Sequence, residues 1–343
     1  MKKVWLSIIM MLATASAAGC SGENARKAEE GGSSPEKVTV ILDYVANTNH
    51  TGLYVALNQG YYTDAGLEVE IVEPTEGATA TLIAAGKGEF GISYQEDVTI
   101  ARTADNPLPV KAIGTIIQHN TSGFASYAEK GITSVSDFEG KTYSGWGGPG
   151  ESAVLEAVMK AAGADFSKLN IIISDGSGFE ALKDRADIMW FFEAWDNVKA
   201  EMNGFPLNYL ELRQLDPRLD YYTPVIITSE SCISENPDMI RRFMAATAKG
   251  YEYAIENPES GAEILHQYAP DNSLELLTAS QRFLADKYRV DTDTWGIMKD
   301  EIWDNYTGFM VDYGIIKEAI PAAECYTNEF LPAGKEAAAA AQR

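Results

Sequence analysis

The sequence has few of the residues on which most catalytic and metal centres depend. Three of its 343 residues are cysteines and three are histidines. The histidines, His50, His119 and His266, lack the spacing of zinc ligands, and neither a Gly-x-Ser-x-Gly motif nor another nucleophile pattern occurs. These absences favour binding over catalysis.

Long apolar segments are also lacking after the first residues. No later run reaches the roughly 20 residues that span a bilayer. The start is different, because two lysines precede an apolar run at residues 4–12 and small residues then lead to Cys20. This pattern predicts a lipoprotein signal peptide over residues 1–20, with Cys20 as the lipidated first residue of a protein anchored on the extracytoplasmic face of the membrane. An uncleaved anchor is the alternative, for which the apolar run is short.

Positive charge is scarce. The chain has 27 Lys and Arg against 50 Asp and Glu, a net charge of −23, which becomes −25 once the two lysines of the signal peptide are removed. Such a charge argues against nucleic acid or an anionic membrane surface as a partner.

Only two cysteines remain after Cys20. Outside the cytoplasm, Cys232 and Cys325 can form one disulfide. Two separate buried thiols fit the sequence nearly as well, and the pattern leaves both options open.

Strands and helices alternate along most of the chain, which predicts an α/β fold. The alternation is interrupted once and then resumed by helices, as expected for two lobes joined by a hinge that the chain crosses twice. The first lobe is expected to contain residues 37–124 and 224–333, and the second residues 125–223. Residues 21–36 are rich in Gly, Ser and charge and predict a flexible tether, and residues 334–343 form an alanine-rich tail.

Polar and aromatic residues gather where predicted strands end and helices begin. The loop after strand 38–42 contains more polar and aromatic groups than helix capping requires. Similar residues follow the strand at 90–93, and open α/β folds bind ligands at such edges. The candidate ligand-binding residues are Tyr44, Asn47, His50, Thr51, Tyr94, Glu96, Ser122, Trp190, Glu193, Trp195, Tyr221 and Tyr222.

A glycine-rich loop at residues 145–151 also opens onto a helix. Its N–H groups could hold an anion. The loop lacks the lysine and serine of a nucleotide-binding P-loop, and a tight turn explains its glycines equally well.

Several runs resemble one known family: residues 47–56, 93–96, 118–126, 221–224 and 328–332. They are similar to the ThiY family of ABC-transporter substrate-binding proteins for pyrimidine precursors of thiamine, relatives of SsuA-like proteins. The resemblance implies a type II periplasmic-binding fold, a permease and an ATPase as partners, and no cofactor. The eukaryotic thiamine-pyrimidine synthase shares this fold but has a cysteine-rich iron motif, which this chain lacks.

A flat heterocycle with an amino group suits these strand ends. Aromatic faces from Tyr44 and Trp195 are expected to sandwich the ring, because stacking on an aromatic side chain contributes roughly 1–3 kcal/mol. Glu193 is expected to accept hydrogen bonds from the amino edge, while Asn47 and Tyr94 fix the orientation.

Other interpretations remain open at this point. At least one of Trp190 and Phe192 is expected to be core, and a lysine or arginine partner is the alternative for Glu193. Riboflavin and a sulfonate or nitrate are the alternative ligands. An anion would need a basic clamp, for which the strand ends offer only Arg102 and Lys141 nearby.

Overall fold

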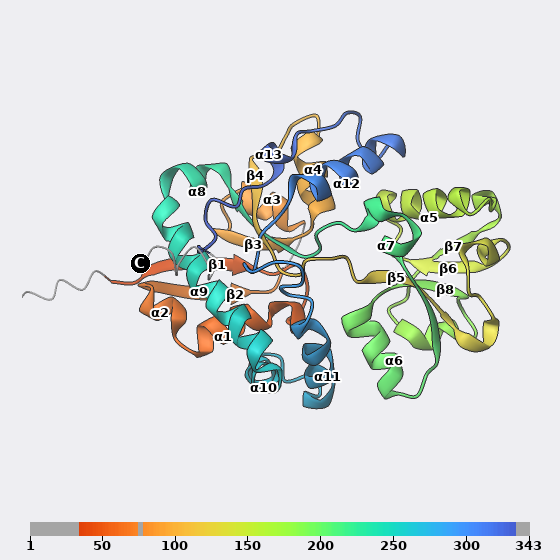
Figure 1. The fold of residues 1–343 in the computed structure, drawn as a ribbon, viewed down its shortest axis with the longest axis horizontal. Coiled ribbons are helices and arrows are strands. Elements are labelled where there is room, and N and C mark those ends of the chain that lie inside the picture. Colours follow the sequence, from red (N-terminus) through yellow and green to blue (C-terminus); the bar gives the residue numbers. More distant parts are fainter. Residues whose placement is uncertain (1–33, 75–77, 334–343) are drawn as a thin grey trace, which may run out of the picture. The chain divides into compact units, whose positions relative to one another are not determined.

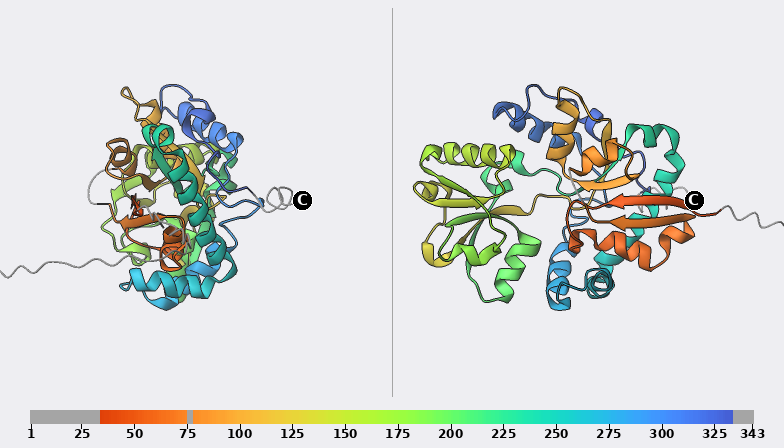
Figure 2. Two further views of the ribbon diagram at one scale, coloured as in Figure 1. Left: turned by 90° about the vertical axis from the view of Figure 1, so that its left-hand side faces the viewer. Right: turned by 180° about the vertical axis from the view of Figure 1, so that it is seen from behind.

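The computed structural model describes residues 34–74 and 78–333. The predicted signal peptide, its Cys20 and the predicted tail lie outside these residues. The described residues form ten strands in two five-stranded sheets. Helices cover both faces of each sheet (Figures 1 and 2).

The first sheet has the order β2-β1-β3-β10-β4. β1 runs parallel to both β2 and β3, and β10 pairs antiparallel with β3 and β4. The strands are β1 (Glu36–Ile41), β2 (Leu67–Val72), β3 (Phe90–Ser93), β4 (Val110–Thr115) and β10 (Val225–Ser229).

The second sheet has the order β7-β6-β8-β5-β9. β6 runs parallel to β7 and β8, while β5 pairs antiparallel with β8 and with β9. The strands are β5 (Ser122–Tyr127), β6 (Thr142–Gly145), β7 (Asn170–Ile173), β8 (Ile188–Phe192) and β9 (Leu207–Glu211).

Thirteen α-helices occur in the described residues, and a π-helical turn, Glu193–Asn197, follows β8. The helices are α1 (Thr51–Asn58), α2 (Tyr61–Asp64), α3 (Thr79–Ala84), α4 (Gln95–Thr103), α5 (Pro149–Ala161), α6 (Val198–Met202), α7 (Leu212–Leu215), α8 (Glu230–Glu235), α9 (Pro237–Glu256), α10 (Pro258–Tyr268), α11 (Leu274–Ala285), α12 (Asp300–Asp312) and α13 (Ala322–Cys325).

The period of two in each strand decides which core a side chain enters. Val38 and Val40 of β1 pack in one core with α1, α9, α10 and α11, whereas Ile41 packs in another with α3, α4 and α13. In β8, Trp190 faces a core with α5, and Phe191 faces one with α6. Both faces are apolar because both are covered by helices.

The chain passes from the first sheet to the second between β4 and β5. The boundary predicted at residue 124 falls inside β5, where Ser122 already pairs with Phe192 of β8. The predicted boundary comes a few residues after the start of β5. Extended residues occur on both sides of it, and periodicity therefore does not mark where the chain changes sheet. The chain returns at β10, which begins at Val225.

Helix α12 contributes to cores of both sheets. Tyr306, Phe309 and Met310 pack in the core beside the second sheet, although the sequence placed this helix in the first lobe. Trp303, on the same helix, packs in a core of the first sheet. A helix with two apolar faces can join two cores, and sequence periodicity does not show which core each face meets.

The two described cysteines are buried and free. Cys232 and Cys325 pack in different cores, so the disulfide that the sequence left open does not form in this structure. In residues 34–74 and 78–333, no helix has the length and apolar character needed to cross a membrane.

Candidate functional site

Exposed aromatic rings follow four parallel strands. β1 and β3 are neighbours in the first sheet and β6 and β8 in the second, and such a ring lies within three residues of the end of each strand. The rings belong to Tyr44, Tyr94, Trp146 and Phe192, which are 65%, 42%, 55% and 42% exposed. Because ligands of α/β proteins bind beyond the carboxyl ends of strands, these rings mark the candidate site.

The same strand ends contain carboxylates but no Lys or Arg. We call residues 42–50, 94–97, 146–151 and 193–197 the strand-end segments. Their acidic residues are Asp43, Glu96, Asp97, Glu151, Glu193 and Asp196. Such a set favours a ligand that donates hydrogen bonds or carries positive charge.

Several of these carboxylates have partners within the chain. Asp97 accepts a hydrogen bond from Oγ of Ser93 (2.6 Å), and Asp196 accepts one from the N–H of Phe192 (2.9 Å). Burial raises the pKa of Asp196 to about 6 and also raises the pKa of Asp97. These two groups shape the ends of β3 and β8.

Glu151 fills the glycine-rich loop after β6. Its buried carboxylate accepts hydrogen bonds from the Tyr143 hydroxyl (2.5 Å) and from the N–H groups of Gly147 (2.6 Å) and Gly148 (3.2 Å). The N–H groups that the sequence suggested for an external anion are therefore occupied by a side chain of the same helix. The structure therefore contradicts the suggestion that this loop binds an external anion.

Glu96 lies where the two sheets' strand ends meet. Its Oε2 accepts a hydrogen bond from the Tyr306 hydroxyl of α12 (2.8 Å). A Cβ on Gly150, at the start of α5, would overlap with Oε1 of Glu96, so glycine permits this close approach. Burial raises the pKa of Glu96, against the lowering effect of the Tyr306 hydrogen bond. Tyr221 stacks on Tyr306 with 4.1 Å between ring centroids.

Glu193 has no hydrogen bond or ion pair to its carboxylate from any described residue. The side chain is half-buried at the end of β8. Burial and the nearby Glu211 raise its pKa, while Lys287 and Arg213 act in the opposite direction. Lys287 and Arg213, the kinds of partner considered from the sequence, are thus near, but neither forms an ion pair with Glu193.

The two predicted tryptophans occupy different environments. Trp195 is partly buried and packs against the core beside β1 and α11, so its ring is not free on both faces. Trp190 is 8% exposed in the core beside α5, as expected for at least one aromatic of β8. Its ring centroid lies 5.2 Å from that of the exposed Trp146.

The loop between β1 and α1 is held by its own polar groups. The N–H of Asn47 donates to Nδ1 of His50 (3.2 Å), so this ring nitrogen carries no proton. The proton is on Nε2, which donates to Oδ1 of Asp43 (2.8 Å). The fully buried His50 therefore fixes the loop's shape.

Other predicted residues of this loop act as caps. The side chain of Asn47 accepts from the N–H of Asn49 (3.0 Å) and donates to the carbonyl of Val45 (2.9 Å). Thr51 donates through Oγ1 to the carbonyl of Thr48 (3.0 Å). Their hydrogen-bonding capacity is largely used within the loop, which leaves Tyr44 as its exposed predicted ring.

Ser122 and Tyr222 are also buried and bonded within the chain. Ser122 donates to Oδ1 of Asn120 from its N–H (2.9 Å) and its hydroxyl (2.7 Å). The Tyr222 hydroxyl accepts from the N–H of Lys299 (2.9 Å), and its own N–H donates to Oε1 of Gln95 (2.9 Å). Both residues stabilise the segments that connect the sheets.

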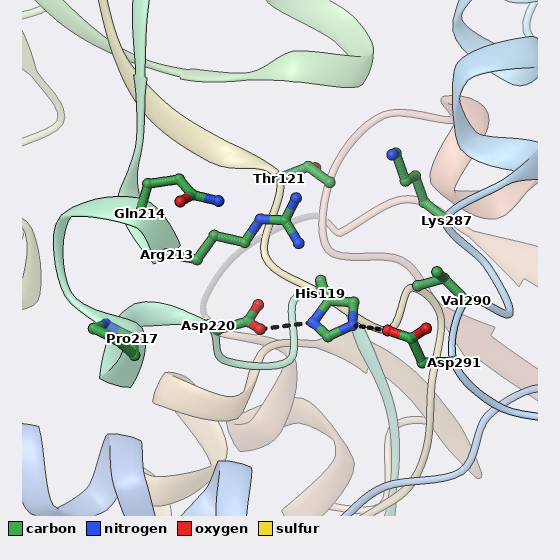
Figure 3. Close-up of a pocket in the computed structure, with 9 residues that line it drawn as sticks. All are labelled: His119, Thr121, Arg213, Gln214, Pro217, Asp220, Lys287, Val290 and Asp291. Atoms are coloured by element: carbon green, nitrogen blue, oxygen red, sulfur yellow. Dashed lines mark hydrogen bonds and ion pairs between the residues drawn. The ribbon is translucent and has the colours of Figure 1, made fainter.

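A polar cavity of about 350 Å³ lies beside these connecting segments (Figure 3). Arg213 extends toward its centre, and its Nε donates to Glu211 (2.9 Å). The residues that line it are His119, Thr121, Arg213, Gln214, Pro217, Asp220, Lys287, Val290 and Asp291. Glu193 adjoins this group, since its N–H donates to the carbonyl of Thr121 (3.1 Å).

His119 connects three segments at the edge of this cavity. Nδ1 lies 2.6 Å from Oδ2 of Asp220, and Nε2 lies 3.3 Å from Oδ2 of Asp291 (Figure 3). The hydrogen bond to Asp220 is the main cause of a raised His119 pKa, and Arg213 acts against it. A protonated ring donates to both carboxylates.

Sequence reasoning missed the cavity residues and Trp146. Arg213, Lys287 and Asp291 come from segments far apart in the chain, and no local pattern links them. Trp146 had a detectable signal, an aromatic residue in a glycine-rich loop directly after a strand. The ligand-binding role of the predicted residues themselves stays a prediction.

Comparison with known proteins assigns the chain to a family. A family model described as NMT1/THI5 like matches residues 47–261, more than half of the sequence. The chain belongs to the NMT1/THI5-like family. The resemblance seen in the sequence is thereby confirmed.

Relatives of this NMT1/THI5-like chain include proteins with different named activities. A formylaminopyrimidine-binding protein of Halalkalibacterium halodurans is 26% identical over 307 residues, which cover 85% of this chain and 90% of that protein. The riboflavin-binding protein RibY of Chloroflexus aurantiacus is 25% identical, with 87% of each chain covered. A 4-amino-5-hydroxymethyl-2-methylpyrimidine phosphate synthase of Legionella pneumophila is 25% identical, with 86% and 92% covered.

Solved structures share the fold. The periplasmic nitrate-binding protein NrtA of Synechocystis PCC 6803 superposes with a TM-score of 0.68 at 12% identity, covering 86% of this chain and 87% of NrtA. The alkanesulfonate-binding protein SsuA of Xanthomonas axonopodis pv. citri, bound to MOPS, gives 0.63 at 10% identity, with 86% and 99% covered. The predicted two-lobed, type II periplasmic-binding fold is confirmed.

Proposed function

We propose that this protein is the solute-binding component of an ABC importer and that its ligand is a thiamine pyrimidine precursor of the formylaminopyrimidine type. The observation that best supports this proposal is the composition of the strand-end segments. They contain exposed aromatic rings and no Lys or Arg, and of their six carboxylates only that of Glu193 makes no hydrogen bond or ion pair to a described residue. Aromatic rings stack on a flat heterocycle, and carboxylates accept hydrogen bonds from its amino group.

Glu193 is the proposed partner of the amino group. A half-buried carboxylate without a hydrogen bond is costly, and a ligand donor would remove that cost. Its raised pKa has the same origin, because burial disfavours the charged form. An aminopyrimidine edge offers both an N–H donor and a ring nitrogen that can share a proton with this carboxylate.

Riboflavin is the second candidate ligand. It is also a large flat ring, and one relative is named for binding it. A sulfonate or nitrate is less compatible with this site, because the glycine-rich loop already holds Glu151 and the strand-end segments supply no cation. Arg213 and Lys287 lie instead at the polar cavity.

Binding rather than catalysis is proposed, although relatives include synthases. Burial raises the pKa of the Cys325 thiol to about 11 and also raises that of Cys232. Since the thiolate is the nucleophile, neither cysteine is prepared for attack. Both pack in cores of the first sheet.

Calorimetric titration of four compounds tests the ligand class. Formylaminopyrimidine, riboflavin, nitrate and MOPS are titrated into wild-type protein and the Glu193→Gln variant. We expect formylaminopyrimidine to bind and the variant to lose about 1.5–3 kcal/mol of binding free energy, because a charge-assisted hydrogen bond is lost. Riboflavin presents an imide N–H between carbonyls, which an amide can match, so a riboflavin site would change little. Binding of nitrate or MOPS alone would refute the heterocycle.

The location is proposed on the sequence pattern before residue 21. Cys20 would carry the lipid that anchors the protein outside the cytoplasm, beside the permease and ATPase of its transporter. Cys20→Ala should release the protein into the soluble fraction. Retention of the variant in the membrane with unchanged mass would contradict lipidation.

A further inference from the structure

One buried donor at the candidate site has no partner. Nε1 of Trp190 is inaccessible to solvent and makes no hydrogen bond to a described residue. An unpaired buried donor costs about 1–3 kcal/mol, and native proteins keep few of them. Where such a donor adjoins a binding site, a ligand can supply the missing acceptor.

The surroundings of Trp190 connect this donor to the proposed site. Trp190 shares its core with Tyr221 and Tyr306, and Tyr306 donates to Glu96. Its nearest strand-end ring is Trp146, tilted by 60° at 5.2 Å. Trp146 is more than half exposed and is followed by Gly147, whose φ of 80° lies in the left-handed region.

Trp303 provides a comparison within the same chain. Its Nε1 is also buried without a partner. Trp303, however, is fully buried, stacks on Tyr326 at 5.4 Å and lies in a core of the first sheet. No exposed strand-end ring contacts it among the described ring pairs. An unpaired indole N–H therefore points to a ligand only where it adjoins the site.

We propose that Trp190 donates its indole N–H to a carbonyl oxygen of the ligand once Trp146 moves aside. This contact would select a heterocycle that carries an acyl group, such as a formylamino group, over the same ring without one. The inference rests on the proposed function and specifies the chemistry at one end of the ligand. Glu193 would bind the amino edge, and Trp190 the carbonyl.

Two substitutions and two compounds test this selectivity by calorimetry. Trp190→Phe removes the N–H and keeps an aromatic ring, and Trp303→Phe is the matched control. The compounds are formylaminopyrimidine and its analogue with a methyl group in place of the formylaminomethyl group. We expect Trp190→Phe to weaken formylaminopyrimidine about five- to tenfold, the value of one net hydrogen bond, and to change the analogue less than twofold. Trp303→Phe should change neither.

A second measurement reports on the N–H itself. In a nitrogen–proton correlation spectrum, the indole signal that Trp190→Phe removes should shift on addition of formylaminopyrimidine and stay in place with the methyl analogue. If Trp190→Phe weakens the binding of both compounds equally, the proposal is overturned, and Trp190 contributes only by packing. If the indole signal does not move, the proposal is also overturned, because the N–H then keeps a water molecule as its partner. If wild-type protein binds neither compound, the proposed function fails and this inference with it.

Discussion

The strand end after β1 and the strand end after β8 differ in how their polar groups are used. After β1, His50, Asn47 and Thr51 are bonded to their own loop. After β8, the Glu193 carboxylate and the neighbouring Trp190 N–H have no partner among the described residues. The polar groups at a strand end thus fall into two kinds, according to whether they are hydrogen-bonded within the chain. Those already bonded hold the loop, and those left unpaired are available to a ligand.

The largest expected effect concerns the buried histidine of the first strand end. His50→Ala should lower the free energy of unfolding by about 2–4 kcal/mol, because it leaves a cavity and two unpaired groups, the Asn47 N–H and the Asp43 carboxylate. Urea unfolding measures this change. A midpoint of unfolding equal to that of wild type would contradict the structural role assigned to His50 in this loop.

A smaller effect is expected for the cap of the same loop. Asn47→Ala removes the side-chain oxygen that accepts from the Asn49 N–H. Loss of such a cap typically costs about 1 kcal/mol. Thermal unfolding at fixed pH should show the loss, with Asn58→Ala, an exposed helical position, as the control.

The fold could be predicted from the sequence because strand and helix periods and their order are local signals. The use of the polar residues could not, because the local bonds of Asn47 and His50 depend on a loop conformation that contacts distant in sequence hold in place. Thr48 meets Ser280 at 2.6 Å, and the Tyr288 hydroxyl donates to the carbonyl of Thr48 at 2.7 Å. These contacts exist only after α11 packs beside the loop. Asn47 and Glu193 therefore looked alike in the sequence.

The free energy of unfolding should depend on pH through His119, which lies in the segments that connect the sheets. The raised pKa of His119, caused first by its hydrogen bond to Asp220, means that the folded protein retains this proton more strongly than the unfolded chain. The stabilisation is fully present below the unfolded pKa of about 6.5 and is lost as pH rises through the folded value. Asp291 also raises the pKa of His119, whereas burial and, to a smaller extent, Arg213 lower it.

Comparison with His119→Gln isolates this contribution. The difference in unfolding free energy between wild type and variant should shrink as pH is raised from 6 to 9. Urea unfolding at several pH values provides the measurement. A difference that stays constant or grows with pH would show that the ring is not held as an imidazolium.

The smallest stability effect is expected at the second strand end. Burial raises the pKa of Glu193, so its charged form destabilises the fold as pH rises from the unfolded value through the folded one. Glu193→Gln should therefore leave stability at neutral pH within about 0.5 kcal/mol of wild type or raise it slightly, as for a position without native partners. A loss of several kcal/mol would reveal a bond that holds β8.

Titration of formylaminopyrimidine into Asn47→Ala and Glu193→Gln tests the distinction between the two strand ends most directly. Both residues were predicted ligand contacts. Glu193→Gln should weaken binding at least tenfold at unchanged stability, because it loses a charge-assisted bond to the ligand. Asn47→Ala should reduce stability and leave the affinity within about twofold, since its polar atoms already bond within the loop. The reverse pattern would contradict the assignment of recognition to the unpaired groups of the second sheet.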